Sequence, residues 1–255
     1  MGAYKIDKNA KGYWLFTITR NEKRNAINYE VMDGLLEVME QAKSNQAKAL
    51  VITGSGDQAF CSGGDLSVFH SLTTKEEAHP MLAKMAAILY ELAIFPMPTI
   101  AIMNGYAVGG GMELAAACDF RLARKGIKAG FVQGKQAITT GWGGASLLSE
   151  KIAVDAALKL LITAELYTAE QLKEAGFVSD LYEKDPLEAC EKYLEKILSI
   201  ETSVLKAYKE VWLRKWEGSG LRERIDKEVL SCSILWESDA HHSYVRNFIG
   251  KQNKL

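Results

Sequence analysis

The sequence predicts an α/β fold, because strand and helix patterns alternate in the first part of the chain and only helix patterns follow. Apolar residues recur there either in short β-prone runs or three and four residues apart, the spacings of strands and of amphipathic helices. Beyond Gly143-Gly144 the patterns are mainly helical. We therefore expect a boundary near residues 195–200, with a core over residues 1–195 and a helical C-terminal region over residues 196–255.

The first elements along the chain form a predicted hairpin. The runs 4–7 and 13–19 are β-prone, and the sequence Asn9-Ala10-Lys11-Gly12 between them is typical of a turn. The spacing of apolar residues then predicts a helix over 28–42. The same signals predict strands over 49–53, 99–103 and 120–123 and helices over 76–95 and 112–118, the first of these helices ending at Pro96 and Pro98.

The C-terminal half is predicted to be a series of helices, over 145–151, 153–163, 168–175, 186–199, 201–217 and 220–237. Those after about residue 195 carry apolar residues on faces that look exposed, namely Val204, Leu205, Val211 and Trp212. Apolar surface of this kind marks an interaction site. We expect these helices to mediate self-association.

Composition limits the classes of partner. The chain has 255 residues, a formal net charge of −1, 48% hydrophobic and 25% charged residues, so it has no general attraction for nucleic acid or anionic lipid. Its four cysteines lie far apart, without the paired spacing of metal ligands. The N-terminus lacks the apolar stretch of a signal peptide, and no apolar run is long enough to span a bilayer. We expect a cytoplasmic protein with reduced thiols, no metal, and neither nucleic acid nor membrane as partner.

The residues 107–119 read AVGGGMELAAACD and place three glycines directly before a predicted helix. Glycine lets a ligand approach the backbone without meeting a Cβ atom, and the first N–H groups of a helix have no intrahelical partner. Gly109-Gly110-Gly111 therefore offers free donors at the positive end of a helix, a construction that suits an oxyanion. The alternative is that the glycines only allow close packing and that Glu113 only favours the helix dipole.

A second glycine-rich turn makes the oxyanion interpretation more specific. The residues 59–66 read AFCSGGDL and follow a predicted strand. An oxyanion hole commonly needs two donors that converge on one oxygen. Each turn alone is a weak signal, and the two together in this order are specific.

The two turns together resemble the crotonase (enoyl-CoA hydratase/isomerase) superfamily, whose members carry A-F-x-x-G-x-D followed by N-G-x-A-x-G-G-G-x-E-L. Here residues 59–65 read AFCSGGD and residues 104–114 read NGYAVGGGMEL. Further similarity lies in ITRNEKRNAIN (18–28), with Asn21 where the family has proline, in AACDFRLA (116–123), and in GWGG (141–144), preceded by Thr140 instead of proline.

The resemblance implies a spiral of ββα turns followed by a helical trimerisation region, so that a homotrimer or a dimer of trimers is expected. It also implies an acyl-CoA substrate whose thioester oxygen binds two backbone N–H groups, here those of Gly64 and Gly110. Because CoA is part of the substrate, no separate cofactor is implied. Family hydratases use two glutamates. Glu113 occupies the first position, and the match to residues 141–144 places Gln133 at the second.

Gln133 decides between the reactions of the family. An amide cannot take up and return a proton, and general acid–base assistance is worth about 10²–10⁴-fold, so two-glutamate hydration should be weak, and allylic isomerisation that uses a second carboxylate should be weak as well. Loss of CO₂ from a malonyl-type thioester forms the enolate without a base. The local sequences ACDFRL, FVQGK and TTGWGG also resemble the ethylmalonyl- and methylmalonyl-CoA decarboxylases of the family.

Three functional hypotheses remain at this stage. The broad one is a hydratase/isomerase-family lyase that works through an enolate, and the sharper one is a decarboxylase of methylmalonyl- or ethylmalonyl-CoA. A third is a non-catalytic acyl-CoA-binding or RNA-binding homologue. The presence of Glu113 and of both glycine turns argues against a degenerate site, and the lack of a basic run with interleaved aromatic residues argues against RNA.

Further residues are expected to contact substrate, each with a structural alternative. Leu66, Tyr106 and Trp142 line the acyl pocket or belong to the core. Arg24 meets the CoA phosphates or lies in a solvated basic loop, and Asp65 has a structural role in the family. The catalytic positions expected are Glu113, Gly64, Gly110 and Gln133, and the substrate-binding positions are Arg24, Ala26, Ser62, Asp65, Leu66, Tyr106 and Trp142.

Overall fold

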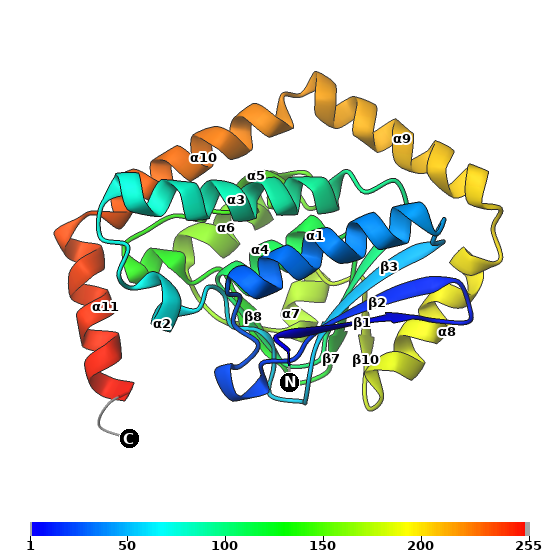
Figure 1. Ribbon diagram of the computed structural model, residues 1–255, viewed down its shortest axis with the longest axis horizontal. Coiled ribbons are helices and arrows are strands. Elements are labelled where there is room, and N and C mark those ends of the chain that lie inside the picture. Colours follow the sequence, from blue (N-terminus) through cyan, green and yellow to red (C-terminus); the bar gives the residue numbers. More distant parts are fainter. Residues whose placement is uncertain (1, 253–255) are drawn as a thin grey trace.

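A sheet of six strands lies at the centre of the molecule (Figure 1). The computed structural model describes residues 2–252 of the chain. The first two strands are antiparallel, and each of the others runs parallel to its neighbour. In spatial order they are β1 (Tyr4–Lys8), β2 (Tyr13–Ile18), β3 (Ala49–Gly54), β5 (Thr99–Met103), β7 (Phe120–Arg124) and β10 (Asp180–Tyr182).

A second sheet is built from much shorter strands. In spatial order these are β4 (Ala59–Cys61), β6 (Tyr106–Val108), β8 (Lys128–Gly130) and β9 (Tyr167–Thr168). Each of β4, β6 and β8 follows a strand of the large sheet along the chain and precedes a helix or a 3₁₀ turn. The chain therefore repeats a strand–strand–helix unit, as the resemblance implied.

The helices cover both sheets. They are α1 (Tyr29–Ser44), α2 (Leu66–Phe69), α3 (Lys75–Ala93), α4 (Gly110–Ala117), α5 (Gly144–Ser149), α6 (Val154–Thr163), α7 (Ala169–Glu174), α8 (Pro186–Leu198), α9 (Thr202–Gly218), α10 (Leu221–Trp236) and α11 (Asp239–Gln252), with 3₁₀ turns η1 (Asn21–Lys23) and η2 (Gln133–Gln136). Figure 1 shows α10 running beside α3. Since α10 also packs against α5, this C-terminal helix contacts two helices of the core.

Two apolar clusters hold these layers together. The larger lies between the sheets and the helices α1, α3, α4 and α10. The smaller lies on the other face of the large sheet, where Cys190 and Leu194 of α8 cover Val51, Ile100 and Leu122. Strands β3 and β5 are buried along their whole length, which explains their continuous apolar sequences.

The expected long elements are present, with ends that differ by a few residues. The strands β8, β9 and β10 were not predicted, and β9 and β10 lie beyond Gly143-Gly144, where the chain was expected to be mainly helical. The short strands β4 and β6 and the last helix, α11, were not predicted either. Strands of two or three residues are too short to show an alternating pattern, and they form by pairing with partners distant in the sequence. The division into core and C-terminal region stays a prediction.

Close packing of α4 on β4 fixes where the second sheet meets the helices. A Cβ atom added to Gly111 would lie 2.0 Å from the carbonyl oxygen of Cys61 in β4. Both groups are backbone, so neither can move aside without displacing a secondary-structure element. Only glycine fits at this position.

We expect Gly111→Ala to lower the free energy of unfolding by about 3 kcal/mol or more, at the upper end of overpacking effects. The control is Gly218→Ala at the end of α9, where an added Cβ meets nothing within 4 Å. This control should be neutral or more stable by about 0.5–1 kcal/mol. Urea denaturation compares them, and equal stability of the two variants would contradict the close approach.

Candidate active site

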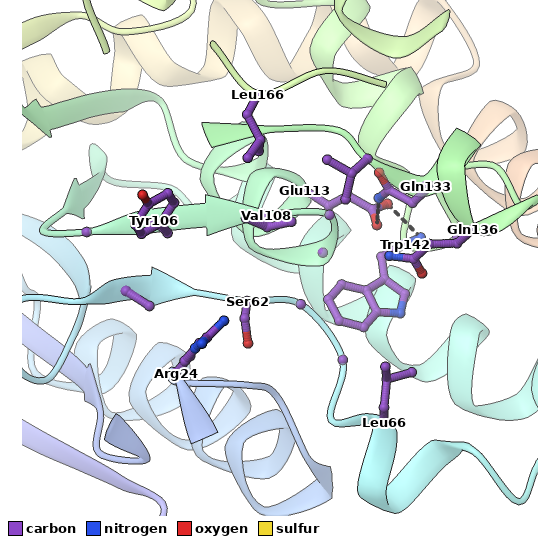
Figure 2. Close-up of a pocket in the computed structure, with 18 of the residues that line it drawn as sticks. Arg24, Ser62, Leu66, Tyr106, Val108, Glu113, Gln133, Gln136, Trp142 and Leu166 are labelled. Atoms are coloured by element: carbon purple, nitrogen blue, oxygen red, sulfur yellow. Dashed lines mark hydrogen bonds between the residues drawn. The ribbon is translucent and has the colours of Figure 1, made fainter. Parts of the chain in front are cut away.

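A cavity of about 990 Å³ lies where the second sheet meets α3, α4 and α10. Its walls come from segments far apart in the sequence, including β6, the turn after β4, the start of α4, η2 and the loop over residues 139–142. Figure 2 shows Glu113, Gln133, Trp142 and Leu66 at one end, and Arg24, Ser62 and Tyr106 toward the other. Nine of the predicted positions line this cavity, namely Arg24, Ser62, Gly64, Leu66, Tyr106, Gly110, Glu113, Gln133 and Trp142.

The three glycines at the start of α4, Gly109 before it and Gly110 and Gly111 in its first turn, are each required for a specific reason. Gly109 has φ 57° and ψ −116°, a conformation that side chains disfavour. A Cβ atom on Gly110 would lie 2.1 Å from the indole ring of Trp142, and one on Gly111 would strike β4. Two of the three glycines are therefore required by close packing, and the packing at Gly110 brings the indole ring against the backbone at the end of the helix.

Two residues with unpaired backbone donors line the cavity. Within residues 2–252, the N–H groups of Gly64 and Gly110 have no hydrogen-bond acceptor. The two turns touch, because an added Cβ atom on Gly63 would lie 3.1 Å from the nitrogen of Gly110. The Trp142 ring flanks both Gly64 and Gly110. Adjacent free donors on a cavity wall, one of them at a helix N-terminus, are a pair that can bind an oxyanion.

An ion pair behind the cavity wall supports the turn that contains Gly64. Arg20 donates to Asp65 Oδ2 and to the carbonyl of Ala26, both at 2.6 Å. Asp65 Oδ1 accepts from the Ser67 N–H at 2.9 Å and so caps α2. Burial disfavours the charged carboxylate, but hydrogen bonds from Ser67 and Arg20 outweigh it and hold the pKa of Asp65 below its usual value. Ala26 and Asp65 are not among the cavity-lining residues.

Glu113 is a buried carboxyl group with three hydrogen bonds. Its Oε1 accepts from the backbone N–H groups of Trp142 at 2.8 Å and Gly144 at 3.0 Å, and its Oε2 accepts from Gln133 Nε2 at 3.0 Å. Gly144 must be glycine, because a Cβ atom there would lie 2.3 Å from Glu113 Cγ. These contacts hold the carboxyl group beside Gln133 and Trp142 at one end of the cavity (Figure 2).

The proton affinity of Glu113 is high. Burial raises its pKa to about 8, the charge of Glu228 adds to the rise, and the three hydrogen bonds oppose it. At neutral pH the group is therefore mainly a neutral acid that can donate a proton.

Gln133 completes the pair and carries an unused acceptor. The side chain is 6% exposed, and its Oε1 is buried without a hydrogen-bond partner. A half-turn of the terminal amide would let Oε1 accept the proton of neutral Glu113 and would direct Nε2 toward the cavity. The second position of the predicted acid pair is thus a neutral amide that can either accept or donate.

The two ends of the cavity differ in polarity. Cationic lining residues belong to the end that contains Arg24, where Arg124 donates to the carbonyl of Asp57 at 2.6 Å and Lys125 pairs with Glu183 at 2.6 Å. The lining residues that sequence reasoning missed are mainly apolar and include Met81, Leu82, Ile138, Cys232, Trp236 and Tyr244. No local motif marks them, because they come from α3, the loop after η2, and the C-terminal helices.

The described residues contain neither a candidate metal site nor a candidate membrane-spanning helix. Within residues 2–252, no three His, Cys, Asp or Glu side chains are grouped in a way that could hold a metal ion. No helix in the same range has the length and apolar character needed to cross a membrane.

The sequence is similar to those of known proteins. A family model described as Enoyl-CoA hydratase/isomerase matches residues 9–252. Ethylmalonyl-CoA decarboxylase of Rattus norvegicus is 31% identical over 249 residues, which cover 94% of this chain and 81% of that protein. (E)-benzylidenesuccinyl-CoA hydratase of Thauera aromatica is 34% identical over 222 residues, which cover 86% of this chain and 84% of that protein.

The fold is shared with solved structures. An enoyl-CoA hydratase/isomerase from Xanthobacter autotrophicus Py2 has a TM-score of 0.88 at 22% identity, and the match covers 99% of this chain and 97% of that chain. Identity this low concerns the fold alone. The resemblance seen in the sequence and the spiral fold that it implied are thereby confirmed.

The raised pKa of Glu113 predicts how stability depends on pH. The ordinary value is 4.5 and the folded value is about 8, so the folded protein holds a proton that the unfolded chain has released. Stability is therefore lost as pH rises from 4.5 to about 8. Glu113→Gln keeps an acceptor for the two N–H groups and removes this loss.

We expect the difference in melting temperature, Glu113→Gln minus the original protein, to become more positive as the pH is raised from about 5 to about 9. Glu40→Gln, at an exposed position of α1, is the matched control and should show no such trend. Thermal denaturation at the two pH values measures the difference. The same pH dependence in all three proteins would show that Glu113 is ionised across the range.

Proposed function

Since the chain belongs to the enoyl-CoA hydratase/isomerase family, we propose that it decarboxylates a malonyl-type CoA thioester through an enolate. In this proposal the N–H groups of Gly64 and Gly110 bind the thioester oxygen. Glu113 donates the proton that completes the reaction. The substrate is of the methylmalonyl or ethylmalonyl type, as the local sequence similarity implied.

The pairing of Glu113 with an amide instead of a second acid is the main support for this proposal. Gln133 donates to Glu113 Oε2 at 3.0 Å and cannot exchange a proton. The other two carboxylates that line the cavity, Asp57 and Glu183, are exposed. Addition of water by two buried carboxylates therefore has no second partner here, whereas loss of CO₂ requires none.

The steps follow from this geometry. The bond between the α-carbon and the substrate carboxylate breaks, its electron pair enters the enolate, and CO₂ leaves. The enolate oxygen carries the charge toward the N–H groups of Gly64 and Gly110. Neutral Glu113 then transfers its proton to the α-carbon and is reprotonated from solvent. The net change is uptake of one proton and release of CO₂.

The apolar end of the cavity favours the same reaction. The lining of this end includes Leu66, Phe69, Met81, Leu82 and Trp236. The cationic residues of the cavity belong to the opposite end. A carboxylate among such groups is poorly solvated, whereas CO₂ is neutral. The relative from Rattus norvegicus, named as an ethylmalonyl-CoA decarboxylase, supports this choice of substrate.

Hydration is the second candidate. The unpartnered Oε1 of Gln133 is an acceptor that can orient a water molecule, and the relative from Thauera aromatica is named as a hydratase. Glu113 would then be the single acid–base group and would have to act in its ionised form. Such a reaction should be slow at neutral pH, because Glu113 is mainly protonated there.

A product assay distinguishes these functions. The protein is incubated with methylmalonyl-, ethylmalonyl-, crotonyl- and 3-enoyl-CoA, and the products are identified by mass spectrometry. We expect the malonyl-type thioesters to lose CO₂ and crotonyl-CoA to react slowly. Rapid hydration of crotonyl-CoA without decarboxylation would overturn the proposal. Retention on a CoA resin without any turnover would favour the non-catalytic acyl-CoA-binding homologue.

Gln133→Glu should lower the rate of decarboxylation at least tenfold. A new carboxylate at this position would face the substrate carboxylate, and two unit charges about 4 Å apart repel by roughly 4 kcal/mol at an effective dielectric constant near 20. A third of that repulsion, about 1.4 kcal/mol, is a factor of ten in rate.

Gln133→Met is the matched control, because it removes the amide without adding charge. Decarboxylation should fall less in this variant than in Gln133→Glu, and crotonyl-CoA hydration should rise only in Gln133→Glu. Equal decarboxylation rates in the two variants would show that charge at this position does not matter.

We also propose that the protein assembles as a trimer or a dimer of trimers. Support comes from apolar side chains that are exposed in the single chain. Val154, Leu158 and Ile162 form a stripe on α6, and Val211 and Trp212 are exposed on α9. Apolar surface of this extent is typical of an interface between subunits.

Sedimentation at micromolar concentration should show a species several times the 28.2 kDa mass of the chain. Trp212→Glu places a charge on the exposed apolar face of α9 and should shift the distribution toward the monomer. A single species of 28.2 kDa for the original protein would contradict the assembly.

A further inference from the structure

The 140–146 loop, defined here as residues 140–143 together with the first turn of α5, contacts both parts of the candidate site. Its Trp142 and Gly144 N–H groups bind Glu113 Oε1. Its Trp142 ring lies against Gly110, one of the two free donors. A shift of this loop would therefore displace the acid and the wall of the oxyanion site together.

Glu228 of α10 ties the two ends of this loop together. Its Oε1 accepts from the Thr140 hydroxyl at 2.5 Å and from the Ala145 N–H at 3.0 Å. Its Oε2 accepts from the N–H of Ser146 at 2.9 Å and from the hydroxyl of the same residue at 2.7 Å. All four hydrogen bonds of one carboxylate are thus made to a single short loop.

One face of α10 is shaped to receive the loop. A Cβ atom on Gly143 would lie 2.9 Å from Ile225, and one on Gly141 would lie 2.7 Å from the Cys232 sulfur. Glu228 lies between Ile225 and Cys232 on the same helix face, at helical spacing. The loop is therefore fixed by packing at its glycines and by charge at its ends.

Two carboxylates share the first turn of α5. Glu113 takes the N–H of Gly144, and Glu228 takes those of Ala145 and Ser146. The N-terminus of a helix stabilises negative charge, but two adjacent carboxylates disfavour each other's ionisation. The hydroxyls of Thr140 and Ser146 also donate to Glu228, whereas Glu113 is the more deeply buried of the two.

We infer that Glu228 is a positioning residue that fixes the 140–146 loop and keeps Glu113 protonated through its negative charge. This role rests on the proposed function, in which Glu113 donates a proton. It agrees with the direction of the pKa of Glu113, which burial and then Glu228 raise.

Few other titratable groups face Glu113. Among the described residues of the elements around Glu113, Cys232 of α10 is the titratable group besides Glu228. Burial raises the pKa of the Cys232 thiol, so the thiol stays neutral. Lys135 of η2 is exposed, and Lys84 of α3 pairs with Asp33 at 2.6 Å. Within this part of the chain, Glu228 is thus the charge that acts on Glu113.

The test uses a chromophoric thioester, so that it does not depend on turnover. The complete protein is mixed with 4-dimethylaminocinnamoyl-CoA, and the absorption maximum of the bound thioester is followed from about pH 6 to pH 10, on either side of the value of about 8 for Glu113. The maximum should change with pH as Glu113 ionises. In Glu113→Gln this change should be absent.

Glu228→Gln should lower the midpoint of this titration by about one pH unit, the usual effect of removing a neighbouring like charge. Glu223→Gln removes a charge from an exposed position on the same helix and should leave the midpoint unchanged. A Glu228→Gln protein that titrates like the original would show that Glu228 only caps α5. Absence of any titration in the original protein would also overturn the inference.

Two further variants test the positioning role and serve if Glu228→Gln does not fold. Glu228→Asp keeps the charge on a shorter side chain, and Thr140→Val removes one donor from the loop. Both should keep the midpoint and reduce the absorption shift of the bound thioester. An undiminished shift in both would refute the positioning role. If no malonyl-type thioester is decarboxylated but these results hold, the proposed reaction fails and the role of Glu228 stands.

Discussion

The rest of the site depends on two hydrogen bonds to the buried carboxyl group of Glu113. The backbone N–H groups of Trp142 and Gly144, both in the 140–146 loop, donate them. They require Gly144 at the start of α5, because a larger residue would occupy the space of Glu113 Cγ. They also place the Trp142 ring against Gly110, where a Cβ atom would collide with it. Gly110 and Gly144, each the first residue of a helix, are thus explained by one carboxyl group and the loop that binds it.

The electrostatics of this contact are a balance between burial and hydrogen bonding. Three hydrogen bonds favour the carboxylate form of Glu113, while burial and the neighbouring Glu228 favour the neutral acid. Burial and Glu228 prevail, since the pKa of Glu113 lies at about 8. Asp65 shows the opposite outcome, because its Arg20 partner and the Ser67 donors outweigh burial. Two buried acids close to one cavity therefore differ in charge at neutral pH, because the hydrogen bonds from Ser67 and Arg20 outweigh burial at Asp65, whereas the hydrogen bonds to Glu113 do not outweigh its burial.

The parts of the site that could be predicted from the sequence are those encoded by local patterns. Glycines before a helix, with a glutamate in its first turn, predict a donor site at Gly110 and a functional group at Glu113. The assignment of Gln133 to the second glutamate position followed from the family resemblance, through the match at residues 141–144. Glu228, Cys232 and Trp236 could not be found in this way, because they lie about a hundred residues from Glu113 and α10 has no motif of its own. The strands β4, β6 and β8 were too short for an alternating pattern, and they form only when the large sheet brings them together.

The charges of the cavity favour a substrate that brings its own negative charge and then loses it. The acid at the apolar end is neutral, its partner is an amide, and the cationic lining residues belong to the end that contains Arg24. A malonyl-type carboxylate in this environment is neither neutralised by a cation nor repelled by a second acid. In the proposed decarboxylation, the charge would pass to the thioester oxygen as CO₂ forms, next to the N–H groups of Gly64 and Gly110, which are unpaired among the described residues. Under this proposal the most favourable site for negative charge is where the enolate forms, so the cavity would stabilise the product of bond cleavage more than the substrate.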